Sequence, residues 1–147
     1  MAEPFILLVE DNASDELLTL RSLKKSGIAN RVVVARDGSE ALDYLFAEGT
    51  HANRDSKELP QVVLLDLNLP KIGGLEVLRR IRADERTRLL PVVILTSSKE
   101  DKDLLGGYAT GANSYVVKPV DFTQFAESVR QLGMFWLVVN QPPPLAR

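Results

Sequence analysis

The chain has 147 residues, the size of one domain, and its hydrophobic fraction of 45% is enough to form a single buried core. Lysine and arginine number 18 and aspartate and glutamate number 20, so a net charge of −2 gives no reason to expect nucleic-acid binding. The chain has no cysteine, which excludes disulfides, thiolate metal sites and thiol nucleophiles.

The first residues do not have the pattern of a signal or membrane segment. Met1 to Pro4 carries an acidic residue where a signal peptide is basic, and the apolar run from Phe5 to Val9 is too short to cross a membrane. We therefore expect a soluble, cytoplasmic protein without a membrane partner.

Strand-like and helix-like patterns alternate along the chain. Near-continuous apolar runs predict strands that are buried on both faces, at residues 5–9, 31–35, 62–65, 92–95 and 115–117. Helical periodicity follows each of them, at residues 17–23, 37–46, 75–81, 102–110 and 121–132. The order (βα)5 predicts an α/β fold with one doubly wound parallel sheet and helices on both faces. A functional site is expected beyond the carboxyl ends of its strands.

Two segments depart from this repeat. Residues 47–60 are polar and predict an exposed loop before the third strand. Residues 134–139 are apolar and precede a run of three prolines, which we expect to be extended. We therefore divide the chain into a domain at residues 1–133 and a carboxyl-terminal arm at residues 134–147.

Three acidic residues follow predicted strands. Glu10 and Asp11 come after the first strand and Asp66 after the third, so the predicted fold brings three carboxylates to one edge of the sheet. Carboxylates that share a site repel each other unless a cation neutralises them. Because no histidine or cysteine accompanies them, the site favours a hard ion such as Mg²⁺. Strand-end acids can also simply cap helices or face solvent.

The fourth and fifth strands end in residues that suit a phosphoryl acceptor. Thr96 offers a hydroxyl and Lys118 a compact positive charge. Phosphoryl transfer depends mainly on positioning and on neutralising charge, so such a small set of groups suffices. Pro119 restricts Lys118 to extended conformations at the strand end.

With these residues placed, the chain resembles the bacterial receiver domains of response regulators over residues 4–133. The resemblance is carried by segments at residues 8–12 (LVEDN), 65–70 (LDLNLP), 73–74 (GG), 95–98 (LTSS) and 115–119 (YVVKP). It implies a flavodoxin-like strand order, 2-1-3-4-5.

The resemblance also implies roles for individual residues. Asp66 would be the phosphoacceptor, and Asp11, Asp66 and the backbone carbonyl of Asn68 would bind Mg²⁺ directly, with Glu10 acting through coordinated water. The remaining implied roles are phosphoryl contacts for Thr96 and Lys118, and a conformational switch formed by Thr96 and Tyr115.

Residues 37–46, the long loop to Pro60 and the segment at 135–140 with its prolines resemble a narrower subgroup, the stand-alone regulators of bacterial and cyanobacterial phytochromes. This likeness implies a sensor histidine kinase, and within that class a bacteriophytochrome, as phosphoryl donor. It also implies a homodimer formed by the fifth helix and the carboxyl-terminal arm. We expect a signalling protein and no enzyme, with protein contacts as its output.

Two other functions fit parts of the same pattern. A hydrolase or phosphotransferase with an aspartyl-phosphate intermediate would need a second acid for its leaving group and a cap over its substrate, and neither is evident. A flavodoxin-like binding module would need a loop rich in Gly, Ser or Thr after the first strand, where this chain has Glu10 to Asp15.

Overall fold

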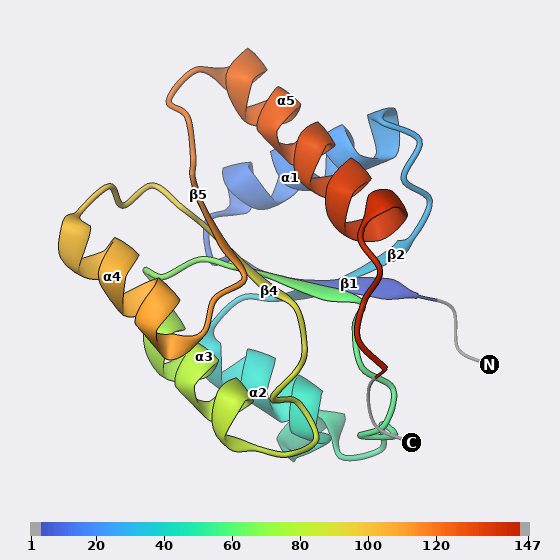
Figure 1. Cartoon of the computed structure of the whole chain (residues 1–147). Helices are drawn as coiled ribbons and strands as arrows, with labels where there is room; N and C mark the ends of the chain where they lie inside the picture. Colours follow the sequence, from blue (N-terminus) through green and yellow to red (C-terminus); the bar gives the residue numbers. More distant parts are fainter. Residues whose placement is uncertain (1–3, 145–147) are drawn as a thin grey trace.

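The computed structural model describes residues 4–144, which form a single five-stranded parallel sheet with helices on both faces (Figure 1). The strands lie in the order β2-β1-β3-β4-β5. Their bounds are β1 Phe5–Val9, β2 Arg31–Ala35, β3 Val62–Leu65, β4 Val92–Thr96 and β5 Ser114–Val117. The predicted (βα)5 order, the doubly wound sheet and the strand order 2-1-3-4-5 are therefore confirmed.

The helices form two layers. Their bounds are α1 Ala13–Lys25, α2 Gly38–Phe46, α3 Gly74–Ala83, α4 Asp101–Thr110 and α5 Phe122–Gly133. Figure 1 shows α1 and α5 side by side on one face of the sheet and α2, α3 and α4 on the other. Each layer encloses its own apolar core, because alternate residues of the strands point to opposite faces: Leu7 and Val63 face α2 and α3, and Leu8 and Leu64 face α1 and α5.

The prediction that all five strands are buried on both faces is correct for β1, β3 and β4 and wrong for the other two. Every residue of those three strands is buried, whereas most of β2 and all of β5 are only partly buried. β2 and β5 are the edge strands, and each has a neighbour on one side only.

Local sequence signals explain where the helices begin and end. The side chains of Asn12, Asp37 and Asp121 accept hydrogen bonds from backbone N–H groups in the first turns of α1, α2 and α5. Gly111 adopts the left-handed conformation that ends α4. The loop between α2 and β3 contains a short 3-10 turn at Gly49–His51.

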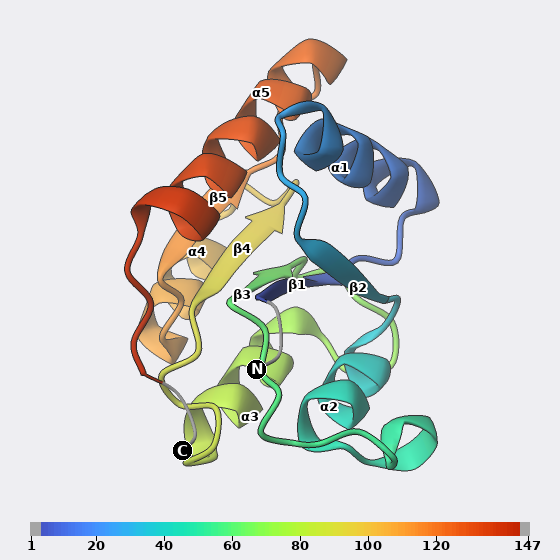
Figure 2. The same cartoon turned by 90° about the vertical axis from the view of Figure 1, so that its right-hand side faces the viewer.

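The chain after α5 does not leave the domain at residue 134. A π-helical segment, Met134–Val139, continues the helix. Trp136 and Leu137 pack partly buried against the α1–α5 core, and the Gln61 side-chain amide donates to the Trp136 carbonyl at 3.2 Å. Figures 1 and 2 show the residues that follow, in dark red, descending from α5 towards the layer of α2 and α3. Residues 145–147 of the predicted arm lie outside the described part.

Within residues 4–144, no helix combines the length and the apolar character that crossing a membrane requires.

Candidate functional site

The three predicted carboxylates meet at the carboxyl end of the central strands. Val9 of β1 pairs with Leu65 of β3, so the residues that follow, Glu10 and Asp66, emerge side by side. Glu10, Asp11 and Asp66 each offer a carboxylate oxygen, and these atoms lie within 4.8 Å of one another. Glu10 and Asp66 are only 2% and 7% exposed, whereas Asp11 is exposed. The sheet therefore holds two acids in a buried setting with a third at the rim.

The backbone around Asp66 fixes its carboxylate. The Asp66 N–H donates to the Val9 carbonyl at 3.1 Å, and the Asn68 N–H donates to Asp66 Oδ1, also at 3.1 Å. The Thr96 hydroxyl, at the end of β4, donates to the same Oδ1 at 2.8 Å. The structure thus brings Thr96 and Asn68 to Asp66, and both are residues that the sequence singled out.

Lys118 places its ammonium group inside the acidic cluster. Its Nζ donates to Glu10 Oε1 at 2.6 Å, to Asp66 Oδ2 at 2.9 Å and to Asp15 Oδ2 at 2.9 Å. Lys118 is itself buried. An ammonium group has three hydrogens, so these three contacts use its whole donor capacity.

Asp15 is the site residue that the sequence reasoning missed. It lies in the first turn of α1, where acidic residues are common because they stabilise the positive end of the helix. That ordinary explanation hides its contact with Lys118. Only its position in the sequence indicated that Asp15 could belong to the site, because Glu10, Asp11 and Asp15 all lie at the end of one strand or in the helical turn that follows it.

Burial and charge pull the site's pKa values in different directions. Burial raises the pKa of Glu10 to about 7, although the contact with Lys118 opposes this shift. Burial also acts to raise the pKa of Asp66, but hydrogen bonds from Lys118, the Asn68 N–H and Thr96 outweigh it, so the pKa is lowered. Burial alone would lower the pKa of Lys118, yet its carboxylate partners raise it. One ammonium is thus shared among several acids.

The donor set fits a hard divalent cation. Glu10, Asp11, Asp15 and Asp66 bring four carboxylates to the site, and among the described contacts Lys118 is the one cation that pairs with any of them, contacting all but Asp11. All available ligand atoms are oxygens, which suits Mg²⁺ or a similar ion. A divalent ion would also neutralise the excess negative charge.

Tyr115 links β5 to the loop after β4. Its hydroxyl donates to the Ser98 carbonyl at 3.0 Å, and its ring, which is partly buried, lies against Gly107 of α4. Thr96 lies on β4 and Tyr115 on β5, and these two strands are neighbours in the sheet, with Thr96 paired with Val117.

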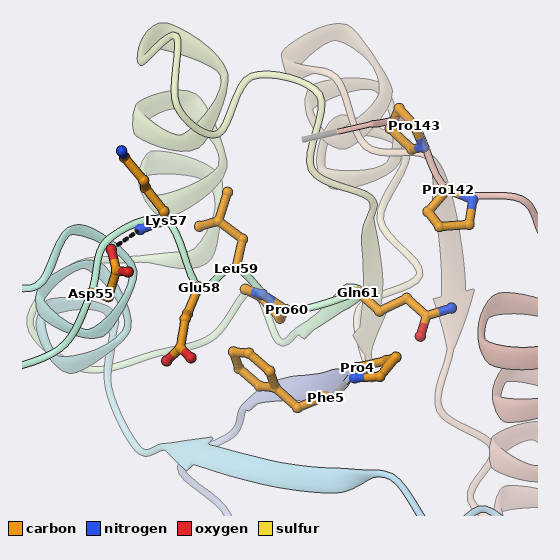
Figure 3. A pocket seen from close by; sticks show the side chains of 10 residues that line it. All are labelled: Pro4, Phe5, Asp55, Lys57, Glu58, Leu59, Pro60, Gln61, Pro142 and Pro143. Carbon is orange, nitrogen blue, oxygen red and sulfur yellow. Dashed lines mark hydrogen bonds between the residues drawn. The ribbon is translucent and has the colours of Figure 1, made fainter. Parts of the chain in front are cut away.

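A separate hollow of about 570 Å³ lies at the other end of the sheet (Figure 3). It is formed by Pro4 and Phe5 at the start of β1, residues 57–61, and Pro142 and Pro143 of the last segment. Lys57 and Glu58 are present, but Figure 3 shows their charged ends directed away from each other. This hollow brings no group to the carboxylate cluster.

A five-stranded α/β sheet with a carboxylate cluster, a hydroxyl and a lysine at its strand ends defines the receiver-domain class of proteins. A family model described as the response regulator receiver domain matches residues 6–130. The chain belongs to this family.

Relatives agree with the assignment along nearly their whole length. A probable methanogenesis regulatory protein, FilR2 of Methanothrix harundinacea, is 43% identical over 96% of this chain and 89% of its own. The phosphorylated cyanobacterial phytochrome response regulator RcpA shares 38% identity with a TM-score of 0.90, covering 97% of this chain and all of RcpA. The Mn²⁺-bound form of Rcp1, a response regulator of Synechocystis, shares 34% identity and a TM-score of 0.90 over 97% of this chain and all of that one.

The chain is accordingly a receiver-type response regulator of two-component signalling, homologous to phytochrome-associated regulators. Receiver domains bind a divalent metal at their acidic pocket, and this chain has such a pocket. The comparisons do not favour the two rival functions, the aspartyl-phosphate hydrolase or phosphotransferase and the flavodoxin-like module.

Proposed function

We propose that Asp66 accepts a phosphoryl group from the phosphohistidine of a sensor histidine kinase. The observation that carries the proposal is the convergence of Lys118, Thr96 and the Asn68 N–H on a buried carboxylate beside two further acids. In the transfer, an oxygen of Asp66 forms a bond to phosphorus while the phosphorus–nitrogen bond of the donor breaks. The histidine nitrogen keeps the electron pair.

The other residues act on charge and position. Lys118 and Thr96 already contact the Asp66 carboxylate, and each carries hydrogens that phosphoryl oxygens can accept. Asp11, Asp66 and the Asn68 carbonyl would hold Mg²⁺, with Glu10 acting through water, and the bound ion would neutralise charge on the carboxylates and the phosphoryl group.

The conformational response follows from the same contacts. Thr96 exchanges its hydrogen bond with Asp66 for one with the phosphoryl group, which draws the end of β4 towards that group. Tyr115, whose hydroxyl is bonded to the loop after β4, then changes position. These two residues form the proposed switch.

The partners are part of the same proposal. RcpA is by its description a phytochrome regulator, which supports a phytochrome-type histidine kinase as donor. The protein acts in the cytoplasm, its output is a protein contact rather than catalysis or nucleic-acid binding, and it forms a homodimer through α5 and residues 134–147. As a receiver rather than a phosphatase, it should hydrolyse a generic phosphate ester negligibly.

Replacing Asp66 with asparagine tests the acceptor. Asp66→Asn keeps the approximate shape but lacks the nucleophilic carboxylate, so the variant should fold and gain no phosphoryl group from acetyl phosphate and Mg²⁺. Intact mass measures the adduct. Asp101→Asn, at an exposed acid of α4, is the control and should be modified like the natural chain. An adduct of equal yield in Asp66→Asn would place the acceptor elsewhere.

A further inference from the structure

The third partner of Lys118 has no part in the transfer described above. Glu10 and Asp66 belong to the carboxylate cluster at the strand ends, but Asp15 comes from α1 and reaches Lys118 across the rim of the site. The Asp15 side chain is 30% exposed, whereas the side chains of Glu10 and Asp66 are 2% and 9% exposed. Lys118 is therefore held by two buried carboxylates and one that water can reach.

Local hydrogen bonding leaves the Asp15 carboxylate free for this contact. At the third position of a helix, an acidic side chain commonly bonds back to the N–H of the capping residue. Here the Asn12 side chain caps the Asp15 N–H at 3.0 Å, but the Asn12 N–H donates to Glu10 Oε2 at 3.3 Å. Asp15 therefore directs Oδ2 to the Lys118 ammonium at 2.9 Å instead.

This geometry points to Asp15 as a resting-state latch, a positioning residue that holds the Lys118 ammonium in the unphosphorylated protein and competes with the phosphoryl oxygens for it. The inference rests on the proposed phosphorylation of Asp66. All three hydrogens of the ammonium are in use, so each one given to a phosphoryl oxygen must leave a carboxylate. The hydrogen donated to Asp66 can pass to the phosphoryl group that Asp66 carries. Of the two partners that stay unmodified, Asp15 gives way to a further phosphoryl contact, because its partly exposed carboxylate is readily rehydrated, whereas stranding the buried Glu10 costs more.

The contact between Asp15 and Lys118 reduces the net free energy that the contact between Lys118 and the phosphoryl group contributes to the conformational change. Part of the attraction between Lys118 and the phosphoryl group replaces the attraction that Asp15 supplied. An Asp15 variant without the negative charge should therefore bind a phosphoryl group, or a mimic of it, more tightly than the natural chain.

The test is a titration with beryllofluoride, a phosphoryl mimic that binds an aspartate carboxylate, at saturating Mg²⁺. Amide NMR shifts at residues 66 and 96 report the affinity. Asp15→Asn should bind about fivefold more tightly, as expected for losing a partly exposed charged contact. Glu16→Gln is the matched control: it removes the same charge one residue further on, from a side chain paired with Arg36 at 3.0 Å. Its affinity should stay at the natural value, and Asp15→Glu, which restores the charge, should return towards it.

A second measurement needs neither metal nor mimic. In Asp15→Asn the ¹⁵N signal of the Lys118 ammonium should shift, and the ammonium hydrogens should exchange faster with water, because one of three hydrogen bonds is weakened. In Glu16→Gln both the signal and the exchange rate should be unchanged. If Asp15→Asn does not fold, Asp15→Ser, which also keeps a polar first turn, carries the same test.

The outcomes separate the latch from the proposed function. If the natural chain fails to bind beryllofluoride, or Asp66→Asn binds it equally well, the acceptor assignment fails. If the natural chain binds and Asp15→Asn matches Glu16→Gln, the latch is wrong. Weaker binding by Asp15→Asn would also overturn it, because Asp15 would then be presenting Lys118 to the phosphoryl group rather than withholding it.

Discussion

Glu10 lies between opposing influences, since Lys118 contacts it at 2.6 Å while burial disfavours its charge. Burial prevails, and the pKa of Glu10 is raised from 4.5 to about 7. A raised pKa means that folded Glu10 holds its proton more tightly than unfolded Glu10. Its contribution to stability is therefore fully present below pH 4.5 and is lost as the pH rises through about 7. A bound divalent cation would oppose this shift by favouring the ionised form.

This shift predicts how Glu10→Gln affects stability without metal. Because glutamine does not titrate, the free energy of unfolding of Glu10→Gln should rise relative to the natural chain between about pH 4.5 and 7. The rise should be at most about 3 kcal/mol. Urea unfolding in EDTA at several pH values measures it. Glu76→Gln should show no such rise, because Arg79 and Arg80 lower the pKa of Glu76 to about 2. A flat difference for Glu10→Gln would mean that Glu10 stays ionised with Lys118.

At the scale of elements, the turn between β3 and α3 decides where Asp66 lies. The Gly74 N–H donates to the Leu67 carbonyl at 3.0 Å, so α3 begins directly against the strand end. A Cβ on Gly74 would lie 2.3 Å from the Asp66 carbonyl oxygen and 2.6 Å from Leu67 Cα. Both neighbours are backbone atoms, so an added side chain would displace Asp66 itself.

Gly74→Ala should therefore destabilise the fold by about 1–3 kcal/mol, the usual cost of overpacking, and slow modification of Asp66 by acetyl phosphate. Gly73→Ala is the matched control, since its Cβ would meet its nearest neighbour, the Leu67 carbonyl oxygen, only at 4.0 Å. Urea unfolding and the rate of adduct formation by intact mass report both effects. Equal behaviour of the two variants would show that the turn tolerates a shift of α3.

At the scale of the whole molecule, the segment after α5 has two different faces. Trp136 and Leu137 pack against the chain's own core, while Phe135, Val138 and Val139 are 46%, 63% and 67% exposed. Apolar side chains grouped in this way favour association, and a twofold arrangement would cover both copies equally. Within one chain, then, Trp136 is already partly covered, and the exposed residues, which include Met134 at 37%, are the ones available to a partner.

We expect the protein to be a dimer in light scattering coupled to size exclusion, and Val138→Ser with Val139→Ser to shift it towards monomer without changing its thermal stability. Leu89→Ser, at an exposed leucine elsewhere on the surface, should leave the dimer intact. Truncation after Gly133 should also give monomer, but with lower stability, because it removes Trp136 from the core. A monomeric natural chain at high micromolar concentration would refute the dimer, and a dimeric double variant would refute the role of these residues.

The sequence alone was sufficient for the order of elements and for most of the site. Buried parallel strands need continuous apolar runs, and their carboxyl ends must meet at one edge, so Glu10, Asp11, Asp66, Thr96 and Lys118 could be assigned to one place before any coordinates were known. The glycines at 73 and 74 showed only a turn, because a close backbone contact leaves no trace in composition.

The tertiary structure alone decided the features that depend on distant neighbours. Asp15 and Lys118 are 103 residues apart, and no local pattern distinguishes an acid that binds a distant lysine from one that stabilises a helix end. The edge strands β2 and β5 were wrongly predicted to be fully buried, because an apolar run indicates a strand but not how many neighbouring strands it has. Residues 134–139 continue α5 because Trp136 and Leu137 find an apolar core beside α1, and that surface exists only once the sheet and both helices have come together.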